Sequence, residues 1–311
     1  MVRIKTRIGR SEERICLERI SNLARNLHST TDSFRFIQQM VSLSALLSSY
    51  DRKLGNSYPR IDENTQDPTY FLAAYFDTEN IPDALLVYRI VRSLTRHVLL
   101  LDRFYETRND RYAFQAEQAR KSASKLLRSE DNLQHLVYSI DYSLRQFSEF
   151  WKYEQVMKRR ILENNIFSYP EIRHFILSKS SDASLVYAKV LDAKLPSFND
   201  NVTSILHYNQ ALLDIQDDWE DIEEDVQEVM PNIFVMAALD KMPYIKIKKS
   251  RHDLIRKVVS DGIESSQGSP ISRLVTELHH LIKSVSIPEN FSFIKILSDR
   301  YVDTLMRTPI I

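Results

Sequence analysis

The sequence predicts an all-α protein built as a single helical domain over residues 1–311. Glycine occurs only 4 times in 311 residues, too rarely for a sheet-rich protein or for a glycine-rich phosphate loop. The 10 prolines stand as punctuation between long runs of residues that favour helices. Hydrophobic residues make up 43% of the chain, enough for a sizeable core. Short loops between the expected helices favour one bundle.

In the N-terminal half, capping residues, prolines and a glycine mark where the expected helices begin and end. We expect helices at residues 11–28, 31–54, 68–76, 82–108, 110–127 and 129–164. Pro82 stands at a first-turn position, and Asn109 or Asp110 breaks the long helix that Pro82 opens. Ser129 and Asp131 are the expected caps of the last of these helices.

In the C-terminal half, prolines end two long helices and a basic loop at residues 241–251 separates the others. We expect helices at residues 170–194, 200–228, 232–239, 253–262, 272–285 and 288–307. The aromatic residues between 147 and 153 recur at helical spacing and are interpreted as core.

Charge and cysteine content exclude several classes of protein. The 42 basic and 42 acidic residues balance, so no general attraction to nucleic acid follows. No uncharged apolar stretch approaches 18 residues, so we expect no transmembrane segment. A single cysteine, Cys16, excludes internal disulfides and fits a reducing compartment. We therefore expect the protein in the cytoplasm.

The acidic stretch at residues 214–228, DIQDDWEDIEEDVQE, carries nine carboxylates and no basic residue. On a helix, seven of the nine fall within an arc of roughly 120°. They are Asp214, Asp217, Asp218, Asp221, Glu224, Asp225 and Glu228. Like charges at i,i+4 destabilise a helix, so this face calls for a cation. A divalent metal is the leading candidate.

A second set of acids, Asp102, Glu106 and Asp110, repeats the i, i+4, i+8 spacing of Asp217, Asp221 and Asp225. Two facing helices of this kind could hold Mg²⁺, which binds one or two carboxylates and completes its octahedron with waters and phosphate oxygens. The interleaved basic residues equally fit a solvated face of ion pairs. They are Arg103, Arg108 and Arg111.

The segment DIQDDWED resembles the second aspartate-rich motif of trans-isoprenyl diphosphate synthases. The matching positions are Gln216, Asp217, Asp218 and Asp221. The same stretch resembles the metal-binding triad of class I terpene synthases, with Asp217, Asp221 and Asp225 at its positions. Both families share an all-α isoprenoid synthase fold with a central apolar cavity, and the resemblance implies that fold here.

The resemblance also implies a function and roles for other residues. It implies an enzyme that uses two or three Mg²⁺ ions to ionise an allylic prenyl diphosphate, as a homodimer or as a heterodimer with a related synthase. Prenyl transfer, cyclisation and hydrolysis all remain open. The implied metal ligands are Asp217, Asp218, Asp221, Asp225, Asp102 and Glu106. The implied diphosphate contacts are Lys179, Arg173, Arg300 and Tyr301. Substrate contacts are Gln216, Phe71, Tyr75 and Tyr88, although core packing explains the aromatic ones equally well.

Departures from the family pattern support a non-catalytic alternative. Arg103 replaces an aspartate of the first motif, the basic segment that holds a homoallylic diphosphate has no counterpart, and the Gly-Lys after the second motif is missing. These gaps fit a partner subunit of the same fold. A less favoured alternative is a di-iron carboxylate bundle using the Glu-x-x-His pairs Glu171/His174 and Glu277/His280. That alternative leaves the acidic stretch unexplained.

Overall fold

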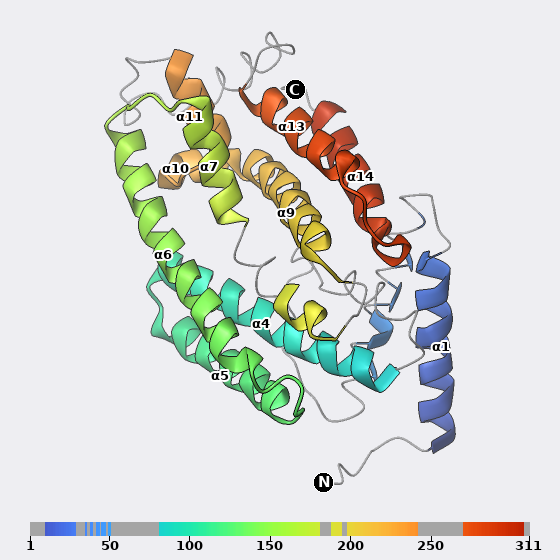
Figure 1. Cartoon of the computed structure of the whole chain (residues 1–311). Helices are drawn as coiled ribbons and strands as arrows, with labels where there is room; N and C mark the ends of the chain where they lie inside the picture. The colour runs from blue at the N-terminus through green and yellow to red at the C-terminus, as the bar shows by residue number, and fades with distance from the viewer. Residues whose placement is uncertain are drawn as a thin grey trace. The chain divides into compact units, whose positions relative to one another are not determined.

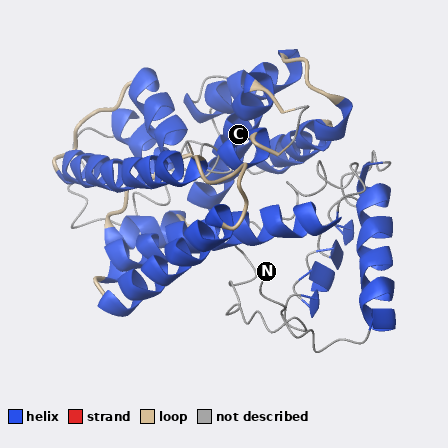
Figure 2. Ribbon diagram, turned by 60° about the horizontal axis from the view of Figure 1, so that its bottom comes forward, coloured by secondary structure: helices blue, strands red, loops and turns tan. Residues whose placement is uncertain are grey.

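The computed structural model of the chain describes residues 10–28, 81–180, 188–194, 198–241 and 270–307, together with individual positions between 35 and 50. Throughout these ranges the chain is mostly helical and has no β-strand, which confirms the all-α class (Figures 1 and 2). None of the described helices is both long and apolar enough to cross a membrane. The predicted helices at 68–76 and 253–262 lie outside the described residues. The isoprenoid synthase type and its central cavity stay predictions.

The chain divides into two compact units. The first comprises Met1–Val137, Val190–Ser197 and Pro288–Phe293, and the second comprises Tyr138–Lys189, Phe198–Ile287 and Ile294–Ile311. The single-domain organisation over residues 1–311 therefore stays a prediction.

The first unit contains helices α1 (Arg10–His28), α4 (Ile81–Thr107) and α5 (Asp110–Arg128). Helices α4 and α5 pack together, and α5 turns a buried alanine face inward that allows close approach. The buried His97 of α4 adds a polar link, because its Nδ1 lies 2.9 Å from the Ala116 carbonyl oxygen of α5. The predicted break at Asn109 is confirmed, since the Asn109 side chain accepts from the Arg111 amide and caps α5.

The second unit contains most of α6 (Leu136–Leu162) and the remaining helices described. They are α7 (Tyr169–Lys179), α9 (Asp200–Glu220), α10 (Ile222–Glu228), α11 (Ile233–Lys241), α13 (Pro270–Ser284) and α14 (Phe293–Arg307). The 3-10 turn η2 (Glu289–Phe291) and the first residue of α14 belong to the first unit. Phe150 and Tyr153 of α6 pack against Phe175 of α7, with ring centroids 5.7 and 6.2 Å apart. Phe150, Trp151 and Tyr153 are half-buried, so the interpretation of this aromatic stripe as core stays a prediction.

The predicted helix starting at residue 129 was wrong at its beginning. Ser129 is the C-cap of α5, since its backbone N–H donates to carbonyls of the preceding turn. Residues 129–135 then form turns whose backbone amides reach back three residues, as from Leu133 to Glu130, and α6 begins at Leu136. A serine with a nearby aspartate fits either end of a helix, and the chain uses the serine at the end.

The two long predicted helices at 170–194 and 200–228 were also wrong in extent. Helix α7 ends at Lys179, where Ser180 is the C-cap. Helix α9 ends at Glu220, and Asp221, with φ −95° and ψ 6°, joins it to α10. Repulsion between carboxylates four residues apart disfavours a continuous helix at this joint. Backbone bonds continue across it, from the Asp221 amide to Asp217 and from the Asp225 amide to Asp221, each 2.9 Å.

Candidate functional site

The carboxylates of α9 and α10 divide into a buried and an exposed group. Asp214 and Asp218 are buried and Asp225 is half-buried, whereas Asp217 and Asp221 are exposed. The opposite, apolar side of the two helices is buried through Ile215, Ile222 and Val226. The acidic face therefore runs from the edge of the core out to the surface.

Asp218 pairs with Lys179 of α7. The Lys179 Nζ donates to Asp218 Oδ1 at 2.6 Å, and the Ile233 backbone N–H donates to Oδ2 at 2.9 Å. Only 1% of the Asp218 side chain is exposed, so both of its oxygens are used inside the protein. Burial lowers the pKa of Lys179, but the charges of Asp218 and Asp214 outweigh burial and hold that pKa well above its ordinary value. Lys179 thus remains a cation beside the acidic face.

Asp214 is held by neutral donors. Its Oδ2 accepts from the Ser180 hydroxyl at 2.6 Å, and its Oδ1 accepts from the Gln210 amide at 2.8 Å. Burial raises the pKa of Asp214, and the neighbouring Lys179 opposes that increase. Asp214 therefore supports the ion pair one turn away, and each of its oxygens accepts a hydrogen bond within the protein.

Asp217 and Asp225 carry negative charge that the protein compensates poorly. Asp217 makes no side-chain hydrogen bond or ion pair within the described ranges. Desolvation by surrounding protein atoms raises the pKa of Asp217 to about 7, and the charge of Asp214 contributes to the increase. Part of the Asp217 side chain nevertheless stays exposed. Burial raises the pKa of Asp225 to about 6, against a 2.8 Å hydrogen bond from the Asn232 amide. A bound cation would relieve both carboxylates.

A magnesium ion at this face would need waters or phosphate oxygens among its ligands, because too few of the described side chains converge there. Nowhere in the described ranges do three side chains of metal-binding type converge on one point. Mg²⁺ commonly takes one or two carboxylates and keeps waters or phosphate oxygens. Asp217, Asp221 and Asp225 suit that chemistry, whereas Asp218 is committed to Lys179.

Tyr301 of α14 also lies within range of the acidic face. Burial raises the pKa of Tyr301 to about 12, and the charges of Asp217 and Asp214 contribute to the increase, whereas the neighbouring Arg300 opposes it. The phenol consequently stays protonated at neutral pH. The structure thus brings together residues of α7, α9 and α14 that the sequence separates by up to 122 positions, from Lys179 to Tyr301.

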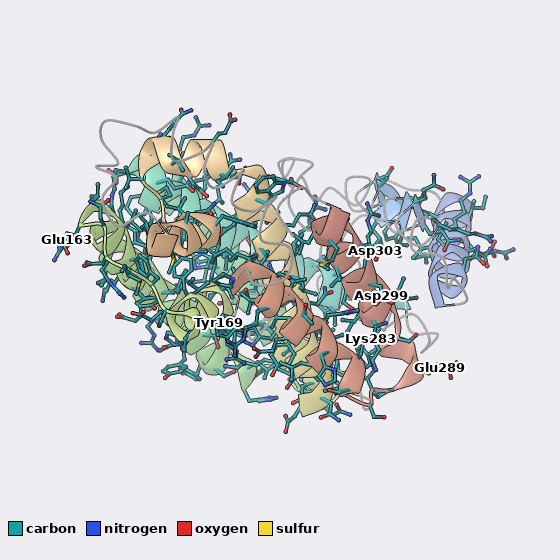
Figure 3. All side chains as sticks on the ribbon, turned by 90° about the horizontal axis from the view of Figure 1, so that it is seen from above. Glu163, Tyr169, Lys283, Glu289, Asp299 and Asp303 are labelled. Atoms are coloured by element: carbon teal, nitrogen blue, oxygen red, sulfur yellow. The ribbon has the colours of Figure 1, made fainter. Side chains whose placement is uncertain are left out.

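Arg173 is held elsewhere, between α7 and α13. Its Nε donates to Glu277 Oε1 at 2.7 Å, while the Tyr169 hydroxyl, labelled in Figure 3, donates to Glu277 Oε2 at 2.5 Å. The guanidinium of Arg273 stacks on the Tyr169 ring at 4.0 Å. Within the described residues, no hydrogen bond or ion pair joins Arg173 to the carboxylates of α9 or α10. The structure therefore does not group Arg173 with Lys179.

Both glutamates of the Glu-x-x-His pairs make contacts within the protein. Glu171 accepts from the backbone N–H and the hydroxyl of Ser168, both at 2.8 Å, and pairs with Arg160 at 2.8 Å. These donors lower the pKa of Glu171, as Tyr169 and Arg173 lower that of Glu277. The two glutamates thus serve as a helix cap and an ion pair, and the di-iron alternative gains no converging ligand set from them.

The remaining predicted residues lie in other surroundings. Gln216 donates to Glu220 at 2.6 Å on the surface of α9, and Tyr88, 1% exposed, accepts from Arg92 at 2.9 Å in the first unit. Asp102 and Glu106 lie exposed near the end of α4. Their predicted position facing the acidic helix stays a prediction, and Phe71 and Tyr75 lie outside the described residues.

The predicted break after residue 108 separates the members of the first acidic set. Asp110 begins α5, beyond Arg108 and Asn109, whereas Asp102 and Glu106 lie on α4. The left-handed conformation of Arg108, with φ 56°, ends α4 between them.

Sequence reasoning missed three residues that hold the acidic face. Ser180 and Gln210 bond to Asp214, and Asn232 bonds to Asp225. Only Asn232 carried a local signal, since an asparagine directly before an apolar run is typical of a helix cap.

No model of a protein family, no curated protein and no solved structure matches this chain.

Proposed function

We propose that the chain is a Mg²⁺-dependent class I isoprenoid synthase that ionises an allylic prenyl diphosphate. The observation that carries the proposal is the neighbourhood of Lys179, Asp217 and Tyr301. A charged lysine stands 2.6 Å from the buried Asp218 and within electrostatic range of the poorly compensated carboxylate of Asp217. Tyr301 lies within electrostatic range of Asp217. These residues come from the segments whose motifs resemble the family.

Each group has a distinct part in the proposed reaction. Asp217, together with Asp221 and Asp225, would hold Mg²⁺, and bound Mg²⁺ would draw negative charge onto the leaving diphosphate. Lys179 keeps its proton and offers a positive charge at the same face. Tyr301 keeps its proton too, because its pKa is raised to about 12, and so can donate a hydrogen bond. Aromatic side chains would shield the allylic cation from water.

A non-catalytic partner subunit of the same fold is the second candidate. The engagement of Asp218 favours it, because both oxygens of the carboxylate already accept from Lys179 and the Ile233 amide. Arg103 in the first acidic set points the same way. Such a subunit would keep the fold and its charges but would need a related synthase for turnover.

The test is to incubate the purified full chain with prenyl diphosphates of several chain lengths and Mg²⁺, with and without isopentenyl diphosphate. Diphosphate release and organic products are followed, and chelation of the metal serves as the control. Release without isopentenyl diphosphate supports a cyclase or hydrolase, and a longer product supports a transferase. No release from any substrate, with the chain shown to be folded, would refute the enzyme and favour the partner subunit.

Variants of the acidic face test the assignment of residues. We expect Asp217→Ala and Asp221→Ala to abolish diphosphate release and to leave thermal stability unchanged or raised, because repulsion between like charges is relieved. Asp200→Ala is the matched control, since Asp200 is an exposed carboxylate in the first turn of the same helix. A large loss of stability in Asp217→Ala in metal-free buffer would mean that this carboxylate pairs within the protein.

A further inference from the structure

Asn232 lies at the junction of α9, α10 and α11 and is 0% exposed. Its Nδ2 donates to Asp225 Oδ2 at 2.8 Å and to the Asp218 backbone carbonyl at 2.5 Å. Its Oδ1 accepts from the amides of Phe234 at 2.9 Å and Val235 at 3.4 Å. Both donors and both acceptor positions of the side-chain amide are therefore used.

The chain reaches this position through a constrained turn. Val229 ends α10 in the left-handed conformation, with φ 58° and ψ 44°, and the Met230 amide closes back on the Asp225 carbonyl at 2.8 Å. A β-branched residue rarely adopts positive φ, so the surrounding contacts must hold it there. The turn carries the chain past the buried Pro231 and places the Asn232 amide against the acidic face.

The joint at Asp221 creates a need for such a restraint. In an uninterrupted helix, the backbone alone would keep Asp217 and Asp225 on one side. Here α9 ends at Glu220 and α10 is a separate helix of 7 residues. Asn232 bonds to both sides of the joint, through the Asp218 carbonyl and the Asp225 carboxylate. Its hydrogen bond uses Asp225 Oδ2, and within the described residues Asp225 Oδ1 accepts no side-chain hydrogen bond.

We propose that Asn232 is a positioning residue that holds Asp225 and the α9–α10 joint in the arrangement that binds a divalent cation. The inference rests on the proposed function, because it assumes a cation at the acidic face. Asn232 itself does not touch the ion. Hydrogen-bond partners behind a ligating carboxylate orient it, and their removal weakens metal binding about 10- to 100-fold.

The chain offers a matched pair of variants. Asn232→Ser keeps a side-chain oxygen that can cap α11 and removes the amide donor, without any change in charge. Asn199→Ser makes the same replacement at the N-cap of α9, where Asn199 accepts from the Val202 amide at 3.1 Å. The control cap lies at the opposite end of α9 from the acidic face.

Binding of Mn²⁺ to the substrate-free full chain, followed by the loss of the free-ion electron paramagnetic resonance signal, tests the proposal. We expect Asn199→Ser to bind Mn²⁺ as the unaltered protein does, and Asn232→Ser to bind it about tenfold or more weakly. Thermal unfolding in chelator reports any purely structural cost separately. Equal Mn²⁺ affinity of folded Asn232→Ser and the unaltered protein would overturn the proposal.

A second variant covers the case in which Asn232→Ser does not fold. Asn232→Asp keeps the shape and the capping oxygen, removes the donor and adds a negative charge. A positioning role predicts weaker Mn²⁺ binding despite the added charge, and tighter binding would overturn it. The unaltered protein could bind Mn²⁺ more tightly than the variants and yet release no diphosphate. That outcome would refute the proposed enzyme and leave the role of Asn232 standing. Absence of Mn²⁺ binding by the unaltered protein would overturn both the cation site and the role of Asn232.

Discussion

Replacing Lys179 by methionine tests how the acidic face is balanced. Methionine is similar in length and apolar, so the change removes the positive charge and the donor and keeps most of the packing. Asp218, with 1% of its side chain exposed, would then be a buried carboxylate without its cation. It would retain only the hydrogen bond from the Ile233 amide at 2.9 Å.

The expected loss of stability follows from the burial of the pair. Removing one partner of a buried ion pair costs about 3–5 kcal/mol, because the other charge stays desolvated. Lys179 keeps 31% of its side chain exposed, which places this pair at the lower end, about 3 kcal/mol. The double variant Lys179→Met/Asp218→Asn removes both charges and should recover to within about 1 kcal/mol of the unaltered protein.

Urea unfolding in chelator at pH 7.5 measures these differences. A deficit below 1 kcal/mol at pH 7.5, or a double variant no more stable than the single one, would refute the reasoning.

Three further predictions concern pH, a surface ion pair and a helix end. In chelator the free energy of unfolding should fall by about 2 kcal/mol between pH 5 and pH 8. In the folded chain Asp217 and Asp225 keep their protons up to about pH 7 and pH 6, whereas the unfolded chain releases them near pH 4. Because Asp217 is exposed to solvent, the loss is smaller than the full pKa difference would give. Asp217→Asn should flatten that dependence in urea unfolding, and an unchanged slope would contradict the raised pKa. Glu277→Gln should cost about 1 kcal/mol in the same assay, because the side chains of Glu277 and Arg173 are each about one-third exposed. A loss above about 3 kcal/mol would show that this ion pair stabilises the chain more than a partly exposed pair does. Arg108→Gly should stabilise the chain by about 1 kcal/mol, because glycine adopts the positive φ of this position freely, whereas Lys121→Gly inside α5 should destabilise it by a similar amount.

Local patterns predicted the features that depend on neighbouring residues. Helical periodicity grouped the carboxylates of the acidic stretch on one face, and Asn109 marked the break before α5. The joint at Asp221 escaped prediction because neither a glycine nor a proline marks it. Helix propensity does not register a change of a few dihedral angles that tertiary contacts impose.

Contacts between distant segments lay beyond the reach of local patterns. Arg173 and Glu277 are 104 residues apart, and nothing near either residue announces the other. The sequence indicates Asn232 as a cap of the following helix, but its hydrogen bonds to Asp218 and Asp225 depend on the left-handed turn at Val229. Lys179 came to notice only through the resemblance to a family, and its direct partner Asp218 emerged from the fold.

The shortness of α10 has a consequence for how the acidic face moves. A helix of 7 residues is not stable alone, so α10 depends on buried Ile222 and Val226 and on the bond from Asn232. We expect its amides to exchange with solvent through local opening, at a free energy below that of global unfolding. A cation that binds only the closed form would slow that exchange by mass action. Occupancy of the face could then be followed in hydrogen exchange of one short helix, without any substrate.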